Sequence, residues 1–158
     1  MQRRIHLTQT LLVGTDQPSA ADLQGFAAEG IKSVVDLRRE GEPNQALPPT
    51  AEAETARRFG LAYKHIPVGT DSIDEGTLDR VHSELSRLPQ PIYIHCASGR
   101  RSGTLALIDR AIDEGLTGEA MMARAEQLGF AYGSPELKEF LKRYVDKRQS
   151  PPRSIPGH

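Results

Sequence analysis

A single cysteine is followed by the residue types that could make it a nucleophile. Cys96 has Gly99 at the third position after it and Arg101 at the fifth. A thiolate is a strong nucleophile, a glycine permits the positive φ of a tight turn, and a guanidinium can hold two oxygens of a tetrahedral anion. Glycine falls at that position by chance about 7% of the time, and arginine two residues later makes the coincidence roughly tenfold rarer. The spacing therefore predicts a reactive, anion-binding loop rather than a cysteine buried as a small hydrophobic residue.

The elements around Cys96 are expected to place it at an edge of a sheet. Ile92–His95 is nearly continuous in apolar residues, as central strands are, and a helix is predicted over Thr104–Glu114. In open α/β sheets, ligands bind beyond the carboxyl ends of the strands. The amides of a tight turn and of a helix N-terminus bind anions and favour a thiolate, which lowers a cysteine pKa from ~8.5 to roughly 3.5–7.5.

Strand and helix patterns alternate along the whole chain, which predicts a single α/β domain. We expect a mainly parallel central sheet of four to five strands flanked by helices, with residues 1–149 forming the domain and residues 150–158 a disordered, proline-rich tail. The expected strands are one or two within Ile5–Val13, then Ile31–Leu37, Leu61–Val68 and Ile92–His95. The expected helices are Ala20–Glu29, capped by Ser19 with Asp22, then Ala51–Phe59, Leu78–Leu88, Thr104–Glu114, Gly118–Leu128 and Glu136–Lys147.

Composition excludes several classes of protein. The chain of 158 residues carries 20 Lys and Arg against 21 Asp and Glu, so a formal charge of −1 gives no bulk attraction to nucleic acid or to a membrane surface. No stretch approaches the ~18 to 20 apolar residues that span a bilayer. One cysteine cannot form an internal disulfide and fits a reducing compartment, so we expect a soluble, cytoplasmic protein. The histidine spacing indicates no metal site, and we expect no cofactor.

The segment His95–Gly103 resembles the signature of cysteine-dependent tyrosine and dual-specificity phosphatases, which runs His-Cys, five residues, Arg, Ser or Thr, Gly. Here four residues separate Cys96 from Arg101, one fewer, and this shorter spacing is that of the rhodanese sulfurtransferase loop. The wider sequence resembles a bacterial group of phosphatase-like domains, described as β-lactamase-hydrolase-like, whose loops include the short form. That wider resemblance covers about residues 10 to 115 and includes Asp16–Ser19, Gly30–Arg38 and His65–Val68.

The resemblance implies a protein tyrosine phosphatase-like fold and a two-step phosphoryl transfer. Cys96 would attack phosphorus to give a phosphocysteine, which water then hydrolyses. Ser102 would hydrogen-bond Cys96 and help it leave, and His95 would orient the loop from behind. The phosphate oxygens would be held by Arg101 and by the amides of Ala97, Ser98, Gly99, Arg100 and Arg101. The substrate would be a phosphorylated protein or a small phosphomonoester.

The leaving group needs a proton, and the resemblance implies that an aspartic acid from another loop supplies it. Asp71 and Asp74 both lie in the loop after the predicted strand Leu61–Val68, and we prefer Asp71. Asp74 is also a candidate for the cap of the following helix. Asp36 is less suitable because it lies within a predicted buried strand.

Two alternative functions and the roles of three arginines stay open. Arg38, Arg39 and Arg100 either draw in a dianionic substrate or belong to solvated loops. The six-residue loop from Cys96 to Arg101 also suits a sulfurtransferase that carries a persulfide on the cysteine. A third interpretation is a module that binds phosphate without catalysis.

Overall fold

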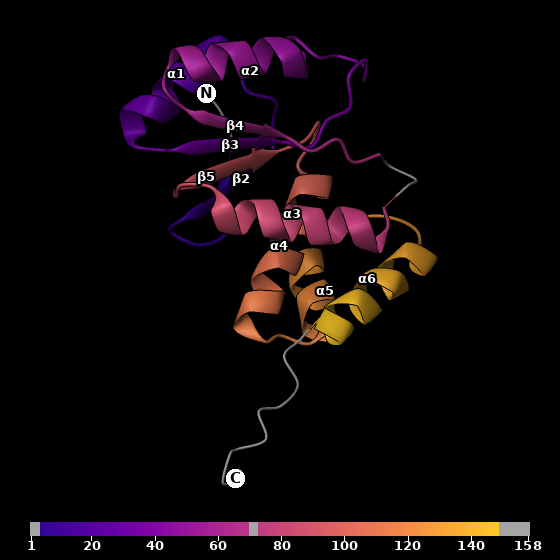
Figure 1. Ribbon diagram of the computed structural model, residues 1–158. Helices are drawn as coiled ribbons and strands as arrows, with labels where there is room; N and C mark the ends of the chain where they lie inside the picture. Colours follow the sequence, from indigo (N-terminus) through magenta and orange to yellow (C-terminus); the bar gives the residue numbers. More distant parts are fainter. Residues whose placement is uncertain (1–3, 70–72, 149–158) are drawn as a thin grey trace, which may run out of the picture.

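A five-stranded sheet forms the centre of the protein (Figure 1). The structure is a computed structural model and describes residues 4–69 and 73–148. The strand order is β1-β2-β5-β3-β4, in which β1 is antiparallel to β2 and the other neighbours are parallel. The predicted α/β class with a mainly parallel sheet is therefore confirmed. The strands are β1 (Arg4–His6), β2 (Leu11–Gly14), β3 (Ser33–Asp36), β4 (Ala62–His65) and β5 (Ile92–His95).

Helices cover both faces of the sheet (Figure 1). Helices α1 and α2 lie on one face, and α3 to α6 lie on the other. Successive residues of a strand point to opposite faces, and each face of the sheet has its own hydrophobic core. Tyr93 of β5 lies in one core with Leu23 and Phe26 of α1. Ile94 lies in the other core with Leu105 of α4. Because β5 is buried on both faces, its sequence is apolar up to the last residue, His95. The helices are α1 (Ala20–Glu29), α2 (Pro49–Arg58), α3 (Glu75–Arg87), α4 (Arg100–Glu114), α5 (Gly118–Gln127) and α6 (Pro135–Arg148).

The predicted cap of the first helix is confirmed. The Ser19 hydroxyl accepts a hydrogen bond from the Asp22 amide at 3.1 Å, and the Asp22 carboxylate accepts one from the Ser19 amide at 2.8 Å. This reciprocal pair satisfies two amides that the first helical turn would otherwise leave unpaired.

The predicted start of helix α4 at Thr104 is wrong, since the helix begins at Arg100. Gly99 stands at the N-cap position with a φ of 97°, a left-handed conformation that glycine adopts without strain. The loop can therefore turn directly into the helix. As a result, Arg101 and Ser102 lie in the first helical turn instead of in a longer loop.

Two further expectations from the sequence concern the boundary of the domain and membrane-spanning helices. The division into a domain of residues 1–149 and a tail of residues 150–158 stays a prediction, because 149–158 lie outside the described residues. Among the helices that the structure describes, none combines the length and the apolar character needed to cross a membrane.

Candidate active site

The Cys96 thiol lies at the carboxyl end of β5, directly before the amino end of α4. The side chain is only 1% exposed, and its Sγ accepts hydrogen bonds from the Gly99 amide at 3.2 Å and from the Ser102 amide at 3.4 Å. The Ser102 hydroxyl lies 3.5 Å from the same sulfur. The two amides point at the position where a thiolate would carry its charge, and the Ser102 hydroxyl also donates to the carbonyl oxygen of Gly99 at 3.3 Å.

The surroundings of Cys96 favour the thiolate over the thiol. Burial alone would raise the pKa of the Cys96 thiol. The hydroxyl and amide of Ser102, the positive charge of Arg101 and the amide of Gly99 outweigh burial, so the pKa lies below its ordinary value. The Cys96 thiol therefore loses its proton and becomes a nucleophilic thiolate at a lower pH than the thiol of a free cysteine does.

A tight approach between two loops explains why residue 99 is a glycine. A Cβ atom at Gly99 would lie 3.0 Å from the Cα of Thr15 and 3.2 Å from the carbonyl oxygen of Gly14. Both of these residues follow or end strand β2. Gly99 is thus required by its positive φ and by its neighbours, and it holds the amide that points at Cys96 in place.

Arg101 is held by a carboxylate from another loop. Its Nη1 and Nη2 each donate to one oxygen of Glu42 at 2.8 Å, and Nη1 also donates to the carbonyl oxygen of Val68 at 2.8 Å. Hydrogen bonds from Arg101 and from the Arg39 amide overcome the effect of burial and lower the pKa of Glu42, so the pair is ionised. Glu42 therefore fixes the orientation of the guanidinium.

The hydrogen bonds of Arg101 leave one edge of the guanidinium available. A guanidinium has five N–H donors, and the contacts with Glu42 and Val68 use three of them. Within the described part of the chain, no hydrogen bond uses Nε–H or the second hydrogen of Nη2. These two donors lie side by side and form a fork that fits two oxygens of a tetrahedral anion.

His95 lies beneath the loop and is fully buried. Its Nδ1 is 3.3 Å from the carbonyl oxygen of Cys96, and its Nε2 is 2.6 Å from a carboxylate oxygen of Glu52. His95 therefore lies between the Cys96 backbone and a buried glutamate, and its role in orienting the loop stays a prediction.

The expectation that Arg38 draws in the substrate is corrected by its burial. Arg38 is 0% exposed, and it donates to both oxygens of Asp36 and to Glu52 at distances of 2.8 to 2.9 Å. A strand-end arginine becomes an interior residue here because two buried carboxylates neutralise it. Arg39 and Arg100 are exposed, and Ala97 and Ser98 form the outer part of the loop between Cys96 and Gly99.

The two candidates for the general acid differ in what the structure says of them. Asp71 lies outside the described residues. Asp74 caps helix α3, where its carboxylate accepts a hydrogen bond from the Thr77 amide at 2.8 Å. That bond lowers the pKa of Asp74 and keeps it ionised, which suits a cap and disfavours a proton donor.

Two carboxylates near the loop were missed by the sequence prediction. Glu52 lies in helix α2 on the same buried face as Thr55 and Ala56, at the helical spacing of three and four residues. A glutamate on a buried face is the pattern that could have identified it. Glu42 lies in an irregular loop, where no periodicity marks the side that faces Arg101.

Among the described residues there are two groups of three side chains whose types and spacing could hold a metal ion. One group is Asp36, Glu52 and His95, and the other is His82, Asp109 and Asp113. The histidine spacing alone did not reveal either group. In the first, Arg38 forms ion pairs with both carboxylates, and in the second Arg110 contacts both aspartates. Both groups are therefore ion-pair networks as they stand.

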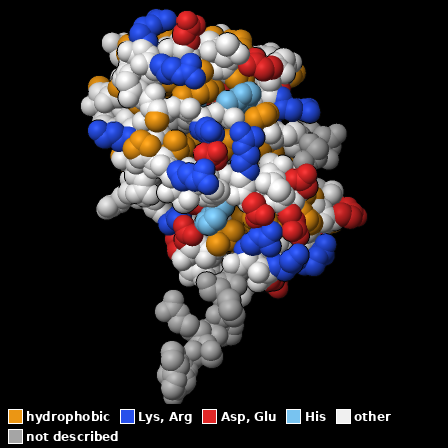
Figure 2. Space-filling view, viewed as in Figure 1, with side chains coloured by type: hydrophobic (Ala, Val, Ile, Leu, Met, Phe, Trp, Pro, Cys, Tyr) orange, Lys and Arg blue, Asp and Glu red, His pale blue; other side chains and the backbone are white. Residues whose placement is uncertain are grey.

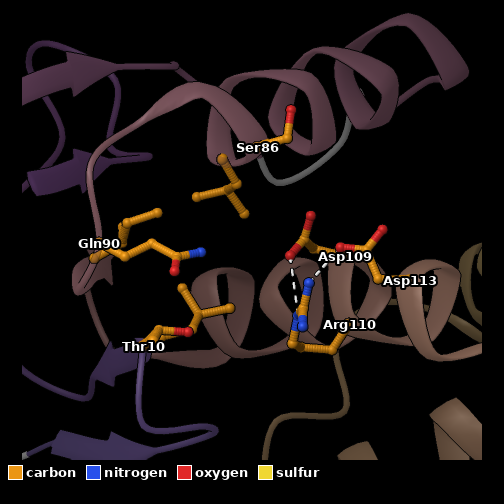
Figure 3. A pocket seen from close by; sticks show the side chains of 9 residues that line it. Thr10, Ser86, Gln90, Asp109, Arg110 and Asp113 are labelled. Atoms are coloured by element: carbon orange, nitrogen blue, oxygen red, sulfur yellow. Dashed lines mark hydrogen bonds and ion pairs between the residues drawn. The ribbon is translucent and has the colours of Figure 1, made fainter.

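A cavity of about 250 Å³ lies beside the second network (Figure 3). Its lining includes Leu11 and Ile92, the first residues of β2 and β5, so it lies at the amino ends of these strands. Figure 3 shows Arg110 bound to Asp109 at its rim. Cys96 follows the carboxyl end of β5, so this cavity is separate from the candidate active site.

Positive charge gathers on the face formed by α2, the edge strand β4 and α3 (Figure 2). A hollow of about 400 Å³ there is lined by Arg57, Lys64, His65 and Arg80 among others. Its lining also includes Glu40, which lies in the same loop as Glu42. The hollow therefore borders the loop that carries Glu42.

Comparison with known proteins agrees with this geometry. Residues 4–113 match the family described as the phosphatase-like domain of β-lactamase hydrolase-like proteins. The β-lactamase hydrolase-like protein of Xylella fastidiosa (strain 9a5c) is 33% identical over 131 residues, which are 83% of this chain and 29% of that protein. The chain thus spans less than a third of the length of this relative.

Solved structures of phosphatases share the fold. Tk-PTP in its active form has a TM-score of 0.71 at 19% identity, over 92% of this chain and 97% of that chain. TpbA of P. aeruginosa has a TM-score of 0.64 at 19% identity, over 89% of this chain and 81% of that chain, and it was also solved in complex with phosphotyrosine. Because residues 4–113, more than half of the chain, match its model, the chain belongs to the family of the phosphatase-like domain of β-lactamase hydrolase-like proteins.

Proposed function

We propose that this chain is a cysteine-dependent phosphatase that hydrolyses phosphate monoesters through a phosphocysteine intermediate. The observation that carries the proposal is the Cys96 sulfur, which accepts hydrogen bonds from Gly99 and Ser102 and has a lowered pKa beside Arg101. The proposed substrates are proteins phosphorylated on tyrosine alone or, for a dual-specificity enzyme, on tyrosine and on serine or threonine. The complex of the related fold of TpbA with phosphotyrosine supports this class.

The first step of the proposed reaction forms a sulfur–phosphorus bond. The Cys96 thiolate attacks phosphorus, the bond from phosphorus to the ester oxygen breaks, and the leaving oxygen takes a proton from a carboxylic acid. The free edge of Arg101 and the amides that follow Cys96 hold the phosphate oxygens.

The second step releases phosphate. Water attacks phosphorus and gives its proton to the carboxylate formed in the first step, and the sulfur–phosphorus bond breaks. Cys96 leaves as a thiolate, because Ser102 and Gly99 donate hydrogen bonds to its sulfur.

An assay of three activities tests the class of protein. We expect hydrolysis of p-nitrophenyl phosphate with a kcat of about 1 to 10 per second, and no transfer of sulfur from thiosulfate to cyanide. Transfer of sulfur without hydrolysis would establish a sulfurtransferase instead. Binding of inorganic phosphate with neither activity would establish a binding module, and either result would overturn the proposal.

Asp71 is proposed as the acid that protonates the leaving group. We expect Asp71→Asn to reduce kcat about 100-fold for phenyl phosphate and to remove the basic limb of the pH profile. The loss should be smaller for p-nitrophenyl phosphate, whose leaving group needs less help from an acid. Asp74→Asn is the matched control, since asparagine is as good a helix cap as aspartate. An equal loss in both variants would contradict the assignment to Asp71.

A further inference from the structure

Four charged or titratable side chains form a buried network behind the candidate active site. Asp36, Arg38, Glu52 and His95 are each 0% exposed. Arg38 bridges the two carboxylates, and Tyr63 donates a hydrogen bond to Asp36 at 2.7 Å. The network joins β3, β4, β5 and α2, and His95 is its point of contact with Cys96.

Both ring nitrogens of His95 face oxygen atoms that accept hydrogen bonds. Nε2 lies 2.6 Å from the Glu52 carboxylate, and Nδ1 lies 3.3 Å from the Cys96 carbonyl. A neutral imidazole has one N–H donor and would turn a lone pair toward one of these oxygens. An imidazolium donates at both positions, so the geometry fits the protonated ring.

The charge of the network favours the same protonation state. Two buried carboxylates, Asp36 and Glu52, face one guanidinium, that of Arg38, so a second cation makes the network neutral. Burial raises the pKa of the Glu52 carboxyl, and the charges of His95 and Arg38 oppose that rise. The 2.9 Å hydrogen bond from Arg38 favours the ionised carboxylate, with the proton on His95.

The charged groups that face His95 raise its pKa, as a protonated ring requires. Burial would lower the pKa of His95, but Glu52 on α2 and Asp36 on β3, the latter 3.9 Å away, outweigh burial and the opposing charge of Arg38. The pKa therefore lies above its ordinary value. The ring of Tyr93 lies 5.9 Å from the imidazole, centre to centre.

We propose that Glu52 is a positioning residue of the candidate active site, which keeps His95 protonated so that the imidazolium orients the loop through the Cys96 carbonyl. Its carboxylate lies on the far side of the ring, so the positive end of the pair faces the cysteine. The pair therefore stabilises the thiolate and holds the Cys96–Ala97 peptide in the orientation that the phosphate requires. The role in phosphate binding rests on the proposed function.

Nitrogen chemical shifts of His95 in the intact, unaltered chain test the protonation state directly. We expect both ring nitrogens to carry protons at pH 7, above the ordinary histidine pKa of about 6.5. A neutral ring at pH 7 would overturn the proposal. This measurement needs no variant and no substrate.

The rate of Cys96 alkylation by iodoacetamide as a function of pH tests the effect on the thiol. In Glu52→Gln we expect His95 to lose its proton near neutral pH and the alkylation midpoint to rise by about 0.5 to 1 unit. Glu54→Gln is the matched control, since Glu54 lies on the exposed side of the same helix and should leave the midpoint unchanged.

A purely structural role would lower the unfolding temperature of Glu52→Gln without moving the alkylation midpoint, and that result would contradict the proposal. Alkylation does not depend on turnover. If the chain hydrolysed no phosphate monoester, the proposed function would fail while the Glu52 experiment could still succeed.

Discussion

Cys96→Ser is expected to reduce phosphatase activity by roughly 10⁴- to 10⁶-fold, as the loss of a nucleophile does in other enzymes that form covalent intermediates. A serine hydroxyl stays protonated at neutral pH, so the two amides that donate to residue 96 would have no anion to stabilise. The substitution is close to isosteric and places a hydroxyl where hydrogen-bond donors are already present. The fold should therefore persist, which an unchanged unfolding temperature would check.

The intermediate provides a second readout of the same prediction. Rapid acid quenching of the unaltered chain during turnover should show one added phosphoryl group on the peptide that contains Cys96, by mass spectrometry. The serine variant should bind inorganic phosphate but form no such adduct. Appreciable turnover by Cys96→Ser would show that another group attacks phosphorus.

Arg101→Lys is expected to lower kcat/KM by about 10³-fold, which is the lower end of the range for an arginine that stabilises a transferring phosphoryl group. Lysine keeps the positive charge, but it cannot contact Glu42 through two nitrogens and present a second fork to the phosphate. Arg100→Lys is the matched control, because that neighbour is exposed and we expect less than about a twofold change.

Glu42 allows the orientation of Arg101 to be separated from its charge. We expect Glu42→Gln to reduce kcat/KM about 10- to 100-fold through misorientation of the guanidinium. Combined with Arg101→Lys, it should add little further loss, because the two residues act as one unit. An increase in activity in Glu42→Gln would instead identify Glu42 as a blocking group that competes with phosphate.

The sequence predicted those features that depend on local patterns. The family resemblance implied a contact between Ser102 and Cys96, and the two side chains lie 3.5 Å apart because a short loop joins the strand and the helix that carry them. Strand β5 was predicted with its observed bounds, since a strand buried on both faces is nearly continuous in apolar residues. The cap at Ser19 follows from spacing within one helical turn.

Other features depend on residues far apart in the chain and could not be read from local patterns. The burial of Arg38 follows from Glu52, which is brought beside it by α2 packing on the sheet. The contact between Glu42 and Arg101 joins residues 59 positions apart. The start of α4 depended on the conformation of a single residue, Gly99, whose φ a sequence does not reveal.

The buried network also constrains how this family can diverge. Loss of one partner of a buried ion pair costs about 3 to 5 kcal/mol, which is a large part of the stability of a small domain, whereas replacement of all partners by packed apolar residues is often neutral. Substitutions at Asp36, Arg38 and Glu52 are therefore tolerated together more readily than singly. These three positions should covary among relatives, and a lineage that has lost the network must have found another way to hold the residue before the cysteine.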